Sequence, residues 1–198
     1  MHASMYEWRD ALRRRGKLPT PIAAKVARHQ LRQQTIERWK EKLADPRTGH
    51  RAVGAIQPVF LAEWMDKRHG GLSFRLVLVL TGHGCFGEYL HKVARREPTT
   101  QSHHCEDHRN TAQHTLEVCP AWEGQRRVLV EEIGKNLSLP AVVEAMVGSR
   151  DAWRAMVFFC KNVISQKEAA ERERENNPDS APIRKRRGAG RRSYARIP

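Results

Sequence analysis

The sequence contains no long hydrophobic run and few cysteines, and each absence excludes a class of protein. No segment approaches the roughly 18 consecutive apolar residues of a membrane-spanning helix. The first residues also lack the apolar centre of a secretory signal peptide. Four cysteines are too few for the disulfide framework of a small secreted domain. We therefore expect an intracellular protein that makes no membrane contact and whose cysteines are thiols or metal ligands.

Acidic side chains are too few to balance the basic ones. In 198 residues the chain carries 36 Lys and Arg against 22 Asp and Glu, a formal net charge of +14. Aromatic residues make up only 7%, but 39% of the residues are hydrophobic, which is enough for a core. The mean hydropathy of −0.69 keeps much of the remaining chain in water. These values favour a globular protein with a polyanionic partner, RNA or DNA.

The excess positive charge lies at the two ends of the chain. Residues 1–52 carry 13 basic and 5 acidic side chains, residues 53–175 carry 16 of each, and residues 176–198 carry seven and one. Asn, Pro, Ser and Gly accompany the arginines of the last segment, which predicts a disordered tail. Its basic run is typical of a nuclear-localisation signal, so we expect a nuclear protein, with the cytoplasm as the alternative. We expect phosphate contacts from Arg28, Arg32, Arg184, Lys185, Arg186, Arg187, Arg191 and Arg192.

Helix signals dominate the rest of the sequence. Thr20 followed by Pro21 is typical of a helix start, and apolar residues then recur at helical spacing for about 23 residues. A second helix is expected within residues 58–68. The apolar run at residues 76–80 fits a strand or a helix, and we favour a helix because Ser73 can cap it. Further helices are expected over residues 122–133, from Pro140 to 148, and after Ser149, where residues 167–175 are purely polar and charge-mixed. The predicted fold class is mostly α.

Three residues in the middle of the chain have the spacing of metal ligands. Cys105, His114 and Cys119 follow the pattern C-x8-H-x4-C. A closed structural zinc site needs a fourth ligand, normally a cysteine three residues before the first. Ser102 occupies that position, and a neutral hydroxyl is a poor substitute for a thiolate. His108 is the candidate replacement.

A simpler interpretation of the same residues needs no metal. The cysteines would be ordinary buried thiols, and the nearby histidines would belong to a polar loop. We favour this interpretation over an occupied zinc site, and we assign Cys160, on the apolar face of the last helix, to the core.

Two sequence blocks carry a resemblance to a known family. Residues 80–91 read LTGHGCFGEYLH and residues 114–122 read HTLEVCPAW. Together with LSLP at residues 137–140, the helix around Trp153 and the Arg-rich end, they resemble the C-terminal end of the reverse-transcriptase polyprotein of insect type-1 non-LTR retrotransposons. That region contains a CCHC zinc knuckle and is thought to hold RNA or DNA during target-primed reverse transcription.

The resemblance implies a function without catalysis. Cys105, His114 and Cys119 match the second, third and fourth knuckle ligands, and Ser102 stands in place of the first cysteine. The Tyr/Phe-Ala-Asp-Asp motif of the polymerase is absent, so no carboxylates are available to hold its metal ions. We therefore expect a non-catalytic nucleic-acid-binding fragment of such a polyprotein, a degenerate remnant whose cofactor, if the knuckle works, is Zn²⁺.

The helix signals, the ligand spacing and the charge distribution together divide the chain into five segments. They are a basic helical segment (1–52), a helical segment before the knuckle (53–101), the degenerate knuckle (102–120), the C-terminal helices (121–175) and the disordered Arg-rich tail (176–198). A helical protein-interaction module that packs on a reverse-transcriptase core is the alternative function. We disfavour an enzyme built on His83, Cys85 and His91, because no orienting group or oxyanion site accompanies them.

Overall fold

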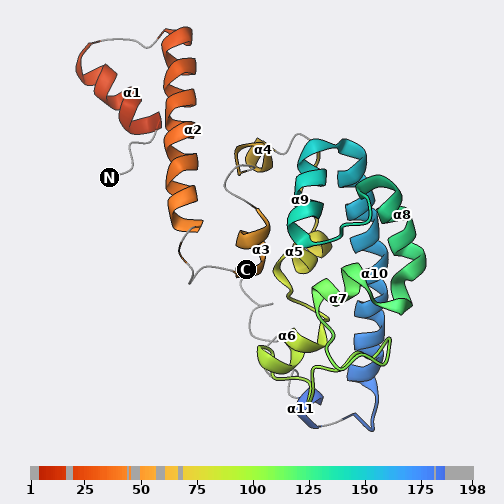
Figure 1. Cartoon of the computed structure of the whole chain (residues 1–198). Helices are drawn as coiled ribbons and strands as arrows, with labels where there is room; N and C mark the ends of the chain where they lie inside the picture. The colour runs from red at the N-terminus through yellow and green to blue at the C-terminus, as the bar shows by residue number, and fades with distance from the viewer. Residues whose placement is uncertain are drawn as a thin grey trace. The chain divides into compact units, whose positions relative to one another are not determined.

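The computed structural model describes residues 5–16, 20–43, 45, 50–56, 61–66, 69–180 and 182–185. Every regular element in these ranges is a helix, which confirms the prediction of a mostly α-helical chain (Figure 1). None of the described helices is both long enough and apolar enough to cross a bilayer. The chain divides into two compact units, Met1–Val53 and Gly54–Pro198.

The first unit consists of helices α1 (Met5–Arg14) and α2 (Pro21–Leu43), which pack on each other. Thr20 caps α2 as predicted, because its Oγ1 accepts a hydrogen bond from the amide of Ala23 at 3.2 Å. Within this unit α2 buries only Ala27 and Ile36. Ile22, Val26 and Trp39, which share the helical spacing, are exposed. The α2 helix is therefore correctly predicted, but its apolar face is only partly covered.

The second unit contains the rest of the described helices. Helix α3 (His50–Ala55) spans the boundary between the units. It is followed by α4 (Leu61–Asp66), α5 (Phe74–Thr81), α6 (Gly87–Lys92), α7 (Ala112–Glu117), the 3₁₀ helix η2 (Pro120–Trp122), α8 (Glu123–Ile133), α9 (Leu139–Gly148), α10 (Arg150–Asn176) and α11 (Pro182–Lys185).

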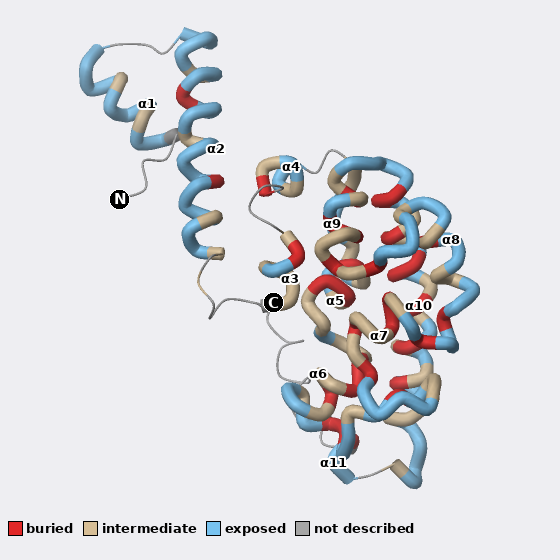
Figure 2. Tube along the Cα trace, in the orientation of Figure 1, coloured by how far each residue is buried: buried red, intermediate tan, exposed pale blue. Residues whose placement is uncertain are grey.

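Helix α10 is the central element of this unit. It begins at Ser149, whose Oγ accepts hydrogen bonds from the amides of Asp151 and Ala152 at 3.2 and 3.3 Å. Helices α5, α8 and α9 pack against it, and the buried residues concentrate where these helices face one another (Figure 2). Met156, Phe159, Cys160, Val163 and Ile164 of α10 are all buried in this core. The assignment of Cys160 to the core is confirmed.

The ambiguous apolar run at residues 76–80 is a helix. The Oγ of Ser73 accepts a hydrogen bond from the amide of Leu76 at 3.2 Å, which starts α5. Gly82 ends the helix with φ of 75°, a left-handed conformation in which glycine has no steric penalty. Leu76, Val79 and Leu80 are buried, so the run packs as one face of a helix rather than as a strand.

The polar end of α10, residues 167–175, contains two buried charged side chains. Lys167 and Glu171 are buried with exposed fractions of 0% and 4%. Glu171 forms ion pairs with Arg96 at 3.5 Å, with Arg174 at 2.9 Å and with Arg184 at 3.4 Å. A buried carboxylate requires such partners, because an unpaired charge in the interior is strongly destabilising.

The same ion pairs correct the prediction of a free tail that begins at residue 176. Residues 182–185 form the short helix α11, and the Arg184 side chain is buried between Glu97 and Glu171. Two buried carboxylates are destabilising unless a positive charge pairs with them, and Arg184, the first arginine of the basic run, provides that charge. The remainder of the predicted tail, residues 186–198, lies outside the described residues.

We predict that Gly87→Ala destabilises the protein. A Cβ atom on Gly87, at the start of α6, would lie 2.6 Å from the carbonyl oxygen of Thr100 and 2.8 Å from that of Gln101. Because both neighbours are backbone atoms, the free energy of unfolding should fall by about 2 kcal/mol. Gly124→Ala is the matched control: nothing lies within 4 Å of its Cβ position in α8, and the change should stabilise by about 0.5 kcal/mol. Chemical denaturation of both variants checks this, and equal effects would contradict the packing at Gly87.

Candidate metal centre

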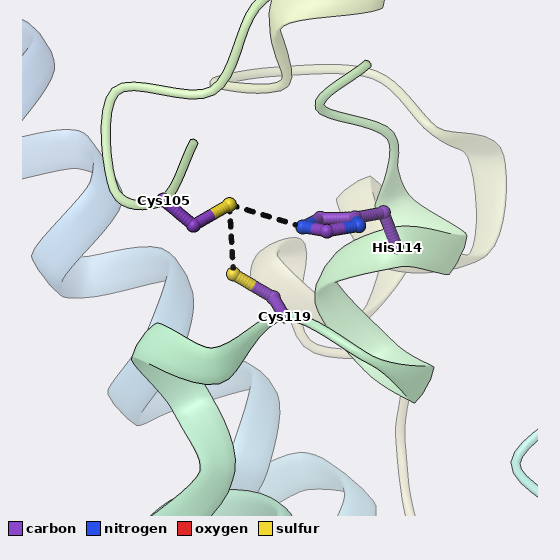
Figure 3. Close-up of side chains that lie close together, drawn as sticks. All are labelled: Cys105, His114 and Cys119. Atoms are coloured by element: carbon purple, nitrogen blue, oxygen red, sulfur yellow. Dashed lines mark hydrogen bonds between the residues drawn. The ribbon is translucent and has the colours of Figure 1, made fainter. Parts of the chain in front are cut away.

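Three side chains from different local structures converge on one point. Cys105 lies in the loop between α6 and α7, His114 lies in α7, and Cys119 follows α7 (Figure 3). The Sγ of Cys105 lies 3.2 Å from Nε2 of His114 and 3.6 Å from Sγ of Cys119. All the possible ligand atoms lie within 4.8 Å of one another. The trio predicted from spacing therefore forms a cluster that can hold a metal ion.

Helix α7 carries His114, and Cys119 follows shortly after its end. It begins at Thr111, whose Oγ1 accepts a hydrogen bond from the amide of His114 at 2.9 Å. Its inner face buries Thr115 and Leu116, which fixes the helix on the core. At its end, the amide of Cys119 donates to the carbonyl of His114 at 2.9 Å. The two ligands are thus connected through one backbone hydrogen bond.

The loop before α7 is closed by its own hydrogen bonds. The amide of Asn110 donates to the carbonyl of Thr100 at 2.8 Å, and the amide of Ser102 donates to the carbonyl of Asp107 at 2.9 Å. The buried Ser102 hydroxyl accepts from the amides of His104 and Cys105 at 3.2 and 3.3 Å. Ser102 therefore shapes the turn that presents Cys105 to the cluster.

The sequence did not reveal that Asp107 orients His114. The Oδ2 of Asp107 lies 3.2 Å from Nδ1 of His114, while Nε2 of the same ring faces Cys105. A carboxylate on one ring nitrogen fixes the proton there and leaves the lone pair of the other nitrogen for a metal, an arrangement that metal-binding histidines commonly use. No spacing rule marks Asp107, because the loop geometry alone brings it to the ring.

The electrostatic surroundings suit a neutral imidazole at His114 and a protonated thiol at Cys119 before metal binding. Burial lowers the pKa of His114, opposed by the nearby Asp107 carboxylate, so the ring is uncharged at neutral pH. Burial raises the pKa of the Cys119 thiol, so that a metal must displace its proton. The ring of His104 packs on Trp122 with centroids 5.1 Å apart, and burial lowers its pKa to about 4. His104 is therefore an uncharged packing residue.

The candidate fourth ligand, His108, is not brought to the cluster. It is exposed, and within the described residues the group of converging ligands comprises Cys105, His114 and Cys119. The carbonyl of His108 accepts a hydrogen bond from Oγ1 of Thr100 at 2.8 Å. His108 as a replacement ligand therefore stays a prediction without a contact to support it.

The predicted phosphate-binding residues have different outcomes. Arg28 and Arg32 are exposed on α2. Arg184 is buried in ion pairs and is not available to a phosphate. Lys185 ends α11, but its side chain lies outside the described residues, as do Arg186, Arg187, Arg191 and Arg192.

The residues of the disfavoured enzyme hypothesis have other partners. The ring of His83 packs on Tyr89 with centroids 4.8 Å apart, and Nδ1 of His91 lies 2.9 Å from the carbonyl oxygen of Glu97. Burial, followed by the charge of Glu171, raises the pKa of the Cys85 thiol. A raised pKa disfavours the thiolate that nucleophilic chemistry needs.

No protein-family model, curated protein or solved structure matches the chain. The geometry of the cluster and the charges around it are therefore the observations that bear on function.

We predict that Asp107→Ala weakens metal binding by roughly 10- to 100-fold, because His114 loses the group that orients its ring. His108→Ala is the control, since it removes an exposed imidazole from the same loop without touching the cluster. Competition with a chelator measures both affinities. A loss in His108→Ala as large as that in Asp107→Ala would contradict the ligand set described above.

Proposed function

We propose that the chain is a non-catalytic nucleic-acid-binding module organised by a zinc ion, like the C-terminal region of a retrotransposon reverse-transcriptase polyprotein that its sequence resembles. The convergence of Cys105, His114 and Cys119, with Asp107 behind the imidazole, is the observation that carries the proposal. Thiolate and imidazole ligands in small closed loops are typical of structural zinc sites.

Zinc would connect parts of the chain that contain little regular secondary structure. The loop that carries Cys105 contains no regular element, and α7 has only six residues. Binding at the cluster would join this loop to α7 and to the start of η2, which in turn packs on α8. The metal would thereby add folding free energy to the segment that has least secondary structure. Its role would be structural.

The nucleic-acid part of the proposal rests on charge. Residues 1–52 have 13 basic and 5 acidic side chains, and Arg28 and Arg32 are exposed on α2 within that segment. An exposed, positively charged helix attracts phosphates and releases their counterions. We propose RNA or DNA as the partner, a nuclear location, and no catalytic activity of the chain itself.

The zinc site is tested by metal content. We expect purified protein to contain one equivalent of zinc by mass spectrometry, and Cys119→Ser to contain none, since the cluster would retain only one thiolate. Cys85→Ser is the matched control, because Cys85 lies outside the cluster and its loss should leave the zinc in place. Wild-type protein that takes up no zinc after refolding with the metal would refute the site.

Nucleic-acid binding is tested by its salt dependence. Binding of a single-stranded RNA should weaken as salt rises, and replacing both Arg28 and Arg32 by Gln should reduce the slope of log K against log salt by about 1.4. Arg150→Gln, at the start of α10 in the charge-balanced segment, is the control and should leave the slope unchanged. Titrations at several salt concentrations, repeated with duplex DNA, provide the measurement. Equal slopes for all three proteins would contradict the role of α2.

Exposed apolar side chains favour the second candidate, a helical module that packs on a polymerase core. Phe74 at the start of α5 is 71% exposed, and Phe158 of α10 is 56% exposed. Both lie in the charge-balanced part of the chain. Salt-insensitive association with a protein, together with salt-independent or absent binding of nucleic acid, would favour this function.

A further inference from the structure

Two of the candidate metal ligands are thiols in direct contact. The Sγ atoms of Cys105 and Cys119 lie 3.6 Å apart, and Figure 3 shows them facing each other within the cluster. A disulfide joins two sulfur atoms at about 2.05 Å, so this pair needs to close by only about 1.5 Å to form one. The cluster therefore holds the reactants of a second chemistry besides metal binding, the formation of a disulfide.

Hydrogen bonds fix the chain on both sides of this contact. The turn that carries Cys105 closes on the Ser102 hydroxyl, which accepts from the Cys105 amide at 3.3 Å. The amide of Cys119 donates to the carbonyl of His114 at 2.9 Å, and the carbonyl of Cys119 accepts from the amide of Trp122 at 3.2 Å. The two sulfur atoms are therefore held in contact by the fold, and a disulfide would join segments that already lie together.

The two thiols differ in their access to solvent, and this difference sets the order in which they react. Cys105 is half-buried, whereas Cys119 is 1% exposed. A small oxidant therefore reaches Cys105 first. Oxidation of an accessible thiol gives a sulfenic acid, which condenses with a neighbouring thiol to a disulfide. Cys119 is positioned as that neighbour.

The other two of the four cysteines are placed differently. Cys160 is fully buried among the apolar side chains of the core, and Cys85 lies before α6, outside the metal-binding cluster. In the part of the chain that the structure describes, the sulfur-to-sulfur contact is that of Cys105 with Cys119. The fold thus selects one pair.

We propose that Cys105 and Cys119 form a reversible dithiol–disulfide pair that hydrogen peroxide oxidises and that excludes the metal when oxidised. In the first step the Cys105 thiol reacts with the peroxide to give a sulfenic acid and one water. In the second step the sulfur of Cys119 bonds to that of Cys105, and the sulfenic oxygen leaves as a second water. The thiols lose two electrons, which cleave the O–O bond of the peroxide, and the two thiol protons end in the waters.

The exclusion of the metal rests on the metal site of the proposed function. A disulfide uses both sulfur atoms that would bind zinc and leaves His114 as the remaining member of the trio. Zinc bound to both thiolates would in turn withhold them from the peroxide. Nuclear proteins are kept reduced, and disulfides there are usually transient and catalytic or redox-sensing. In the proposed nuclear location, the pair makes metal occupancy depend on the oxidant.

Peptide mapping of the full-length chain tests the inference. The zinc is removed with a chelator in the presence of a reductant, the reductant is washed out, hydrogen peroxide is added, and the remaining thiols are alkylated. Arg109 lies between Cys105 and Cys119, so trypsin places the two thiols in separate peptides that only a disulfide can join. We expect mass spectrometry to find these two peptides linked, and treatment with dithiothreitol to separate them and restore zinc uptake.

Bound zinc should slow the formation of the link. At a free zinc concentration about tenfold above the dissociation constant, the rate should fall about tenfold, because only the metal-free fraction of the protein reacts. Cys85→Ser is the matched control and should form the link at the wild-type rate, since Cys85 lies outside the cluster. Cys119→Ser should form no link and should instead accumulate a sulfenic acid at Cys105, which dimedone traps.

The outcomes separate this inference from the metal site itself. Metal-free wild-type protein that forms no link, or that joins Cys105 to Cys85 as often as to Cys119, would overturn the pair, and the metal site would stand if zinc still binds. A link that forms equally fast with and without bound zinc would overturn the exclusion of the metal. If the link forms but zinc never binds, the metal site falls and the exclusion falls with it, while the dithiol pair is supported.

Discussion

The second unit depends on how α10 buries both apolar and charged side chains along one continuous helix. Its first half packs on α5, α8 and α9 through large apolar residues. Its second half buries Lys167 and Glu171, one of each charge, against residues of the loop between α6 and α7 and of the short helix α11. Each buried charge requires partners, and those partners fix the segments that provide them. Lys167 holds the loop through Asn110, and Glu171 holds Arg96 and the start of the C-terminal segment.

The helices were predictable because their ends are encoded locally. Thr20, Ser73 and Ser149 each cap a helix with a side-chain oxygen, and this chemistry is visible in a few consecutive residues. Spacing also marked Cys105, His114 and Cys119 as one candidate group, because the intervals between them match those of metal ligands. The sequence therefore predicts those features that depend on residues close together in the chain, such as helix caps and ligand spacing.

The errors concern partners that are distant in sequence. Lys167 and Glu171 occur in a run of charged residues, which is typical of a solvated helix, and only the folded chain shows what covers them. Arg184 looks like one member of a basic tail, yet it lies between two carboxylates, one of them in the loop between α6 and α7. Asp107 was missed for a related reason, because its contact with His114 follows from the shape of the folded loop. Burial of charge depends on tertiary pairing, which no periodicity encodes.

Ser102 contributes to the shape of the loop rather than to its set of thiolate ligands. The Ser102 oxygen accepts two backbone hydrogen bonds that form the turn, and this turn presents Cys105 to the cluster. The turn does not need sulfur, but zinc binding does, because a serine hydroxyl stays protonated at neutral pH. Ser102 therefore determines the shape of the loop, whereas the atoms that can hold a metal come from Cys105, His114 and Cys119.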